Sequence, residues 1–182
     1  MKSLKTIIIT TVILTLICGI ATAGLAFTND LTADRIEKLA AETEQKAMKR
    51  VVSAEIYEKN TVELNGNHDY YTAVSDGETV GYIFTVSTNG YGGAVKVMTG
   101  IDTDGKVIAV EVLDASNETP GLGQNVTRKS FWEQFKAQSG TLTVKQEITP
   151  ITGATISSRA VTESVNQALK MYNIIKEDGS NG

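Results

Sequence analysis

The N-terminal segment of this chain is the sequence feature that most restricts its fold. Residues 6–27 contain no charged side chain, and about 20 consecutive apolar residues are enough for a helix to cross a bilayer. Lys2 and Lys5 precede the segment, and Asp30 is the first charge after it. Because positive charges stay on the cytoplasmic side, the pattern predicts a transmembrane anchor over residues 1–28 and an extracytoplasmic location for the rest of the chain.

A cleaved signal peptide is the competing interpretation of this segment. A basic start, an apolar run and the sequence Ala21-Thr22-Ala23 together fit a signal peptidase site. The apolar run nevertheless continues to Phe27, beyond that cleavage site. We therefore expect the segment to remain on the protein as an anchor in contact with membrane lipid.

The composition of the 182-residue chain argues against several classes of site. The formal charge of −4 argues against a nucleic-acid partner, which would require clustered Lys and Arg. A single cysteine, Cys18, excludes an internal disulfide framework and a cysteine-rich metal site. A single histidine, His68, lies in the polar run at residues 65–69 and leaves little for a zinc site or a Ser/His/Asp triad. We expect no metal site and no catalytic side chain, so any chemistry should depend on a cofactor.

The middle of the chain predicts the sheet of a single α+β domain. Residues 29–53 show the apolar spacing of a connecting helix, with Asn29 or Thr32 as its cap. From residue 54 onward, β-branched and aromatic residues predict strands at 80–86, 93–101 and 107–113. The Asp104-Gly105 pair predicts an antiparallel hairpin between the last two strands.

Two further helices should pack on this sheet, near residues 127–137 and 158–175. The first carries three aromatic side chains that we expect in the core: Phe131, Trp132 and Phe135. A short strand at Leu142 and Val144 should lie between the two helices. The domain then covers residues 54–176, and residues 177–182 should form a flexible tail.

A tight turn followed by a helix lies at residues 150–159. Gly153 permits backbone angles that other residues resist, and apolar residues recur at helical spacing after the turn. The hydroxyls of Thr155, Ser157 and Ser158 are candidates for the helix N-cap. Free N–H groups and the helix dipole stabilise a phosphate at such a place. Taken alone, the sequence is equally compatible with an ordinary turn and cap.

The sequence Thr152-Gly153-Ala154-Thr155, with a hydroxyl residue two positions later, resembles the flavinylation motif of the FMN-binding domain family. In that family the second threonine of the motif carries FMN through a phosphoester bond. The resemblance therefore implies Thr155 as the attachment residue, with Thr152, Gly153 and Ala154 shaping its turn. The family pattern usually has an aspartate three residues before the first Ser/Thr, and Thr149 occupies that position here.

Two glycine-rich sequences precede this motif, Gly90-Tyr91-Gly92-Gly93 and Glu118-Thr119-Pro120-Gly121-Leu122-Gly123. Their order, after a single N-terminal membrane helix, resembles the RnfG family of the Rnf electron transport complex, which is related to the NqrC component of the Na⁺-translocating NADH:quinone reductase. The resemblance implies an extracytoplasmic FMN domain that relays electrons between the other membrane subunits of an ion-translocating ferredoxin:NAD oxidoreductase. It would be a redox subunit without independent catalytic activity.

The same resemblance implies further site residues and a maturation partner. Glu118, Thr119, Leu122 and Gly123 would lie along the isoalloxazine or ribityl side of the FMN, since glycine permits close approach to a flat ring and leucine offers an apolar face. A flavin transferase that depends on FAD and Mg²⁺ would attach the cofactor. Two other functions stay open at this point. One is a stand-alone flavinylated redox carrier, secreted or membrane-anchored, and the other is an extracytoplasmic binding module with no redox role.

Overall fold

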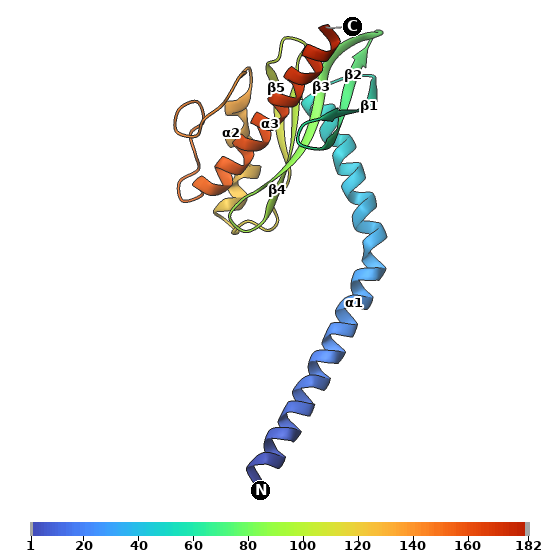
Figure 1. Ribbon diagram of the computed structural model, residues 1–182, viewed down its shortest axis with the longest axis vertical. Helices are drawn as coiled ribbons and strands as arrows, with labels where there is room; N and C mark the ends of the chain where they lie inside the picture. Colours follow the sequence, from blue (N-terminus) through green and yellow to red (C-terminus); the bar gives the residue numbers. More distant parts are fainter. Residues whose placement is uncertain (1, 181–182) are drawn as a thin grey trace. The chain divides into compact units, whose positions relative to one another are not determined.

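The N-terminal helix belongs in part to a unit of its own. The computed structural model describes residues 2–180, and its first element is helix α1, Lys2–Val51 (Figure 1). The chain divides into two compact units between Glu42 and Thr43, inside this helix. Within the first unit, the segment Leu4–Ala33 is long and apolar enough to cross a membrane.

The predicted anchor and connecting helix form one helix with no boundary between them. The prediction that Asn29 or Thr32 caps a new helix is wrong. The Thr32 hydroxyl donates instead to the backbone carbonyl of Thr28, four residues earlier, at 2.9 Å. This back-bonding to the preceding turn is the pattern of a threonine inside a helix.

A five-stranded antiparallel sheet forms the centre of the second unit, in the order β1-β2-β3-β4-β5 (Figure 1). Its strands are β1 Ile56–Glu63, β2 Asn67–Ser75, β3 Glu78–Asn89, β4 Ala94–Ile101 and β5 Val107–Asp114. The three predicted strands correspond to β3, β4 and β5, and their antiparallel pairing is confirmed. Strands β1 and β2 are an additional hairpin.

The turns between β2 and β3 and between β4 and β5 use residues with positive φ. Asp76 and Gly77 connect β2 to β3 with φ of 53° and 79°, the combination that suits a two-residue turn between twisted strands. The turn between β4 and β5 has Gly105 at φ 84°. There the Asp102 carboxylate accepts hydrogen bonds from the backbone N–H groups of Asp104 and Lys106, at 2.9 and 2.8 Å. The predicted Asp-Gly hairpin is therefore confirmed.

The segment after β5 is not the single helix that the sequence predicts at 127–137. It consists of three short pieces: the 3-10 helix η1 at Gly123–Thr127, α2 at Lys129–Trp132 and the 3-10 helix η2 at Glu133–Phe135. Arg128 interrupts the helix because its backbone is extended, with φ −75° and ψ 134°. The expected core role is confirmed for Phe131 and Phe135, which are 4% and 0% exposed and pack edge to face at 5.8 Å.

The predicted strand at Leu142 and Val144 is also absent from the described residues. Val144 makes one isolated bridge to Ile148. The backbone N–H and C=O of Leu142 are both bonded to the Asn166 side chain, at 2.8 and 2.9 Å. Because a side-chain amide occupies these groups, Leu142 has no backbone partner with which to form a strand.

Helix α3 spans Thr155–Ser180 and is longer at both ends than the predicted 158–175. It begins at the predicted attachment threonine. Residues 177–180 are helical, in contrast to the predicted flexible tail, and residues 181–182 of that tail lie outside the described part of the chain.

Both faces of the sheet are covered by helix. On one face α3 packs on β3 and β4 around side chains such as Phe84, Val97 and Val165. On the other face the last turns of α1 pack on Ala73, Ile83 and Met98. The predicted architecture, an antiparallel sheet with packed helices in one α+β domain, is confirmed.

Candidate functional site

Glu118 lies where three separate segments of the domain meet. Its side chain is 1% exposed. One carboxylate oxygen, Oε1, accepts a hydrogen bond from the backbone N–H of Gly92 at 3.1 Å, and Oε2 accepts one from the Ser157 hydroxyl at 2.5 Å. Gly92 belongs to the β3–β4 loop and Ser157 to the first turn of α3. The buried carboxylate therefore connects this loop to the start of α3, at one end of the sheet (Figure 1).

Three glycines make room for the Glu118 carboxylate and for the backbone of Asn117, the residue before it. A Cβ atom on Gly90 would lie 2.1 Å from Oε1 of Glu118, and one on Gly123 would lie 2.4 Å from Oε2. A Cβ atom on Gly92 would lie 2.0 Å from the backbone oxygen of Asn117. The space beside these glycines is thus filled by the protein's own atoms, which fixes the β3–β4 loop against the segment that follows β5.

Hydrogen bonds and close packing hold the turn before α3. The Ser158 hydroxyl accepts a hydrogen bond from the backbone N–H of Ile151 at 3.0 Å and donates to the carbonyl of Ala154 at 2.9 Å. Gly153 has φ 78°, and a Cβ atom there would lie 2.9 Å from Cδ1 of Leu122. The turn is therefore tied to α3 by a serine and to the Leu122 segment by close packing.

The hydroxyl groups near this turn differ in accessibility. Ser157 and Ser158 are 1% and 0% exposed, and each hydroxyl already has a hydrogen-bond partner. Thr155 is half-buried and Thr152 is exposed, and neither hydroxyl bonds to a described residue. The turn thus offers two hydroxyls for modification, Thr152 and Thr155, and Thr155 is the one on the helix.

The start of α3 also offers unpaired hydrogen-bond donors. Within residues 2–180, the backbone N–H groups of Thr155, Ile156 and Ser157 have no acceptor, as is usual for the first turn of a helix. Arg159, one turn further along, is exposed and has no ion-pair partner among the described residues. These donors and the positive end of the helix dipole favour a phosphate. The residues present therefore fit a phosphoester on Thr155.

The remaining predicted site residues separate into a buried pair and an exposed pair. Glu118 and Gly123 are buried. Thr119 is exposed, and its backbone carbonyl accepts hydrogen bonds from the N–H groups of Leu122 and Gln124 at 3.1 and 3.2 Å. Leu122 is 40% exposed. Of these four residues, Thr119 and Leu122 are the ones with side chains at the surface.

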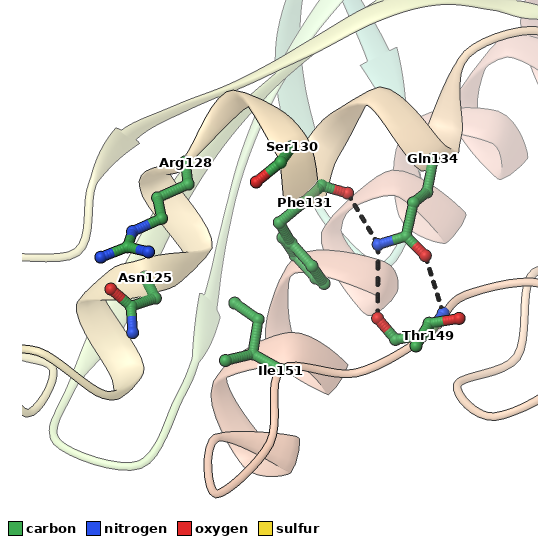
Figure 2. A pocket seen from close by; sticks show the side chains of 7 residues that line it. All are labelled: Asn125, Arg128, Ser130, Phe131, Gln134, Thr149 and Ile151. Carbon is green, nitrogen blue, oxygen red and sulfur yellow. Dashed lines mark hydrogen bonds between the residues drawn. The ribbon is translucent and has the colours of Figure 1, made fainter.

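A hollow of about 370 Å³ borders the segment that enters the turn (Figure 2). It is lined by Asn125, Arg128, Ser130, Phe131, Gln134, Thr149 and Ile151. The Gln134 amide donates to the carbonyls of Phe131 and Thr149 at 3.0 and 3.3 Å, and its oxygen accepts from the Thr149 N–H at 2.9 Å. Gln134 therefore holds the backbone of Thr149, the residue at the position of the family aspartate.

Sequence reasoning misses the roles of Gln134 and of the bond between Glu118 and Ser157. Gln134 carries no signal in the sequence, because a glutamine on a short helix is usually a solvent-facing residue. Ser157 stands out in the sequence only as a candidate helix cap. Its position four residues before Val161, at the spacing of the apolar face of the helix, is the available hint.

Comparison with known proteins gives a consistent result. The FMN-binding domain family matches residues 90–170, and the RnfG N-terminal region matches residues 1–51. The G subunit of the Na⁺-translocating ferredoxin:NAD⁺ oxidoreductase complex of Acetobacterium woodii is 36% identical, covering 88% of each chain. The G subunit of the ion-translocating oxidoreductase complex of Methanosarcina acetivorans is 32% identical, covering 92% of this chain and 94% of that one.

A solved structure shares the fold. NqrC of Shewanella oneidensis superposes with a TM-score of 0.51 over 61% of this chain and 62% of its own, at 16% sequence identity. At that identity the likeness supports the architecture of sheet and helices alone.

Proposed function

Because this chain belongs to the RnfG family of ion-translocating oxidoreductase complexes, we propose that it relays electrons through an FMN attached covalently to Thr155. When bound, FMN supplies one- and two-electron transfer. The chain itself acts as a redox subunit between other membrane subunits of the complex. Its own residues hold and orient the cofactor and carry out no separate reaction.

One observation carries the choice of Thr155. Its hydroxyl is partly accessible, bonds to no described residue and lies on the first turn of α3, next to three free backbone N–H groups. A phosphoester formed there gains the N–H donors and the helix dipole at once. Thr152 is accessible too, but it lies before Gly153 and outside the helix.

The other site residues have two kinds of role in this proposal. Leu122 and Thr119 offer side chains to the flavin from the surface. Glu118 and Gly123 act from inside: the carboxylate holds Ser157, and the glycine leaves room for the carboxylate. Gly153 and Ala154 form the turn that presents Thr155.

Maturation and localisation follow from the same proposal. A flavin transferase that uses FAD and Mg²⁺ attaches the FMN to Thr155 after the domain has folded. The segment Leu4–Ala33 stays on the protein and lies in membrane lipid, with the N-terminus in the cytoplasm and the FMN domain outside. Protease added to intact spheroplasts should then digest the domain. Protection in spheroplasts, or a mature N-terminus at Gly24, would contradict this topology.

Coexpression with a flavin transferase tests the attachment. The purified full chain should be heavier by one FMN less one water, and its yellow colour should survive denaturation. Thr155→Ala should abolish both the added mass and the colour, whereas Thr155→Ser, which keeps a hydroxyl, should retain part of the added mass. Thr152→Ala is the matched control and should weaken flavinylation at most. A covalent flavin on Thr155→Ala would refute the assignment.

A further inference from the structure

The β3–β4 loop holds an aromatic side chain out to solvent on a rigid backbone. Gly90 and Gly92 flank Tyr91, and neither has room for a Cβ atom. The Gly90 N–H donates to the carbonyl of Gly93 at 2.7 Å, and the Gly92 N–H donates to Glu118. Tyr91 is nevertheless 71% exposed and has no hydrogen bond or ring contact with a described residue. The loop is thus fixed in place while its largest side chain has no partner.

Exposed apolar side chains are concentrated around the same site. In the described part of residues 43–182, the large hydrophobic side chains that are exposed are Ile56, Val80, Tyr91, Leu122 and Ile156. The last three come one each from the three segments that meet at Glu118. Three exposed apolar side chains on segments that meet at one residue are a candidate binding surface.

We propose that Tyr91 is the aromatic residue against which the isoalloxazine ring of the bound FMN stacks, with Leu122 and Ile156 completing the apolar contact. This inference rests on the proposed attachment of FMN to Thr155. It assigns to the β3–β4 loop a direct contact with the ring.

The connections through Glu118 place Tyr91 within reach of the tethered flavin. Gly92, the neighbour of Tyr91, bonds to Glu118, and Glu118 bonds to Ser157, two residues after Thr155. Ile156 is adjacent to Thr155 itself, and Leu122 packs on Gly153 in the turn. A ring attached through the phosphate and the ribityl chain would therefore be tethered close to the three segments that carry these side chains. Flat aromatic systems favour stacked or edge contacts with an aromatic side chain over exposure to water.

Fluorescence of the bound flavin tests this contact independently of electron transfer in the complex. A tyrosine or tryptophan ring that touches an excited isoalloxazine quenches its emission, whereas leucine and phenylalanine do not. The full chain is coexpressed with the flavin transferase, its FMN content is measured by intact mass, and emission and lifetime are recorded per covalent FMN. Tyr91→Leu should raise the emission about threefold, because a stack of ordinary strength keeps the ring about twice as often in the quenched, stacked arrangement as in the emitting one.

Three variants complete the experiment. Tyr91→Phe keeps the ring stack without the electron donor and should also raise the emission, but iodide should quench it less than it quenches Tyr91→Leu. Tyr91→Trp should restore the low emission. Ile56→Ala removes another exposed apolar side chain, from the edge strand β1, and should leave the emission unchanged.

Two failures can be told apart. A wild-type chain that gains no FMN mass would refute the proposed function, and the role of Tyr91 with it. A wild-type chain that gains the mass, with a Tyr91→Leu variant whose lifetime equals that of wild type, would overturn only the role of Tyr91.

Discussion

The two helix-covered faces of the sheet are built differently. On the α1 face the buried side chains are apolar: Ala47, Met48, Val51 and Val52 from the helix and Ala73, Ile83 and Met98 from the strands. Charged pairs lie at its rim, between Arg50 and Glu111 and between Lys96 and Glu44. On the α3 face the helix also buries polar side chains: Ser157, Ser158, Thr162, Ser164 and Asn166.

This difference in buried side chains matches a difference in the role of the two faces. Apolar contacts are not directional, so the α1 face depends mainly on shape and area. Buried polar groups must find specific partners, and Ser157, Ser164 and Asn166 find theirs in Glu118, Thr88 and Leu142. These bonds fix the position and rotation of α3, and with them the direction of Thr155. We conclude that the polar face orients the candidate site and the apolar face supports it.

Removal of the Glu118 carboxylate should lower the stability of the domain most. Glu118→Ala leaves the Gly92 N–H and the buried Ser157 hydroxyl without their acceptor and opens a cavity, which should destabilise the domain by about 3 kcal/mol. Denaturant unfolding of the full chain in detergent measures this loss. Flavinylation should fall with it, because the first turn of α3 loses its tie to the β3–β4 loop.

Glu118→Gln is the matched control, since the amide keeps the shape, its oxygen can accept from the Gly92 N–H, and its NH₂ can donate to the Ser157 hydroxyl. It should lower the free energy of unfolding by about 1 kcal/mol, less than the alanine variant does. Equal losses for the two variants would contradict this expectation, because the volume and the hydrogen bonds that the amide retains would then contribute nothing.

A methyl group added on the apolar face should have an intermediate effect and leave the site intact. A Cβ atom on Gly100 would lie 2.6 Å from Cγ2 of Val52 and 2.8 Å from the carbonyl of Val51. Gly100→Ala should therefore displace the end of α1 and destabilise the domain by about 2 kcal/mol. The fraction of chains that carry FMN, measured by intact mass on folded protein, should not change. A loss of flavinylation as large as that of Glu118→Ala would contradict the division between the two faces.

Removal of the ion pair between Arg50 and Glu111, at the rim of the apolar face, should change the stability of the domain least. The hydrogen bond from Arg50 to Glu111 raises the pKa of the Arg50 guanidinium above its usual value, so the pair stays charged at every pH at which Glu111 is ionised. Arg50 is 54% exposed, and exposed pairs of this kind contribute about 0.5 kcal/mol. Arg50→Ala should cost that amount at low salt and less at high salt. A salt-independent loss above about 1 kcal/mol would mean that the pair is buried more deeply than its exposure indicates.

The sequence alone is sufficient to predict the helices and strands that have strong local patterns. The Asp104-Gly105 hairpin and strands β3 to β5 follow from turn chemistry and from runs of β-branched residues. Strands β1 and β2 do not, because each is mostly polar and has one fully buried position, Val62 in β1 and Ala73 in β2.

Tertiary contacts decide the features that the sequence does not reveal. The extended backbone of Arg128 breaks a segment that has the apolar spacing of a helix. The Asn166 side chain takes both backbone groups of Leu142 and prevents a strand there. At the site, the motif identifies Thr155, but the burial of Glu118 cannot be inferred from it. A glutamate is rarely buried, and this one is buried because glycines at 90 and 123 leave room for it.

The most direct test of the central claim is peptide mapping by mass spectrometry on the protein purified from its native membrane. The account predicts one FMN less one water on the peptide that contains Thr155, with fragment ions that place the added mass on Thr155 itself. Unmodified peptides throughout the turn, or FMN on Thr152, Ser157 or any other residue, would contradict it.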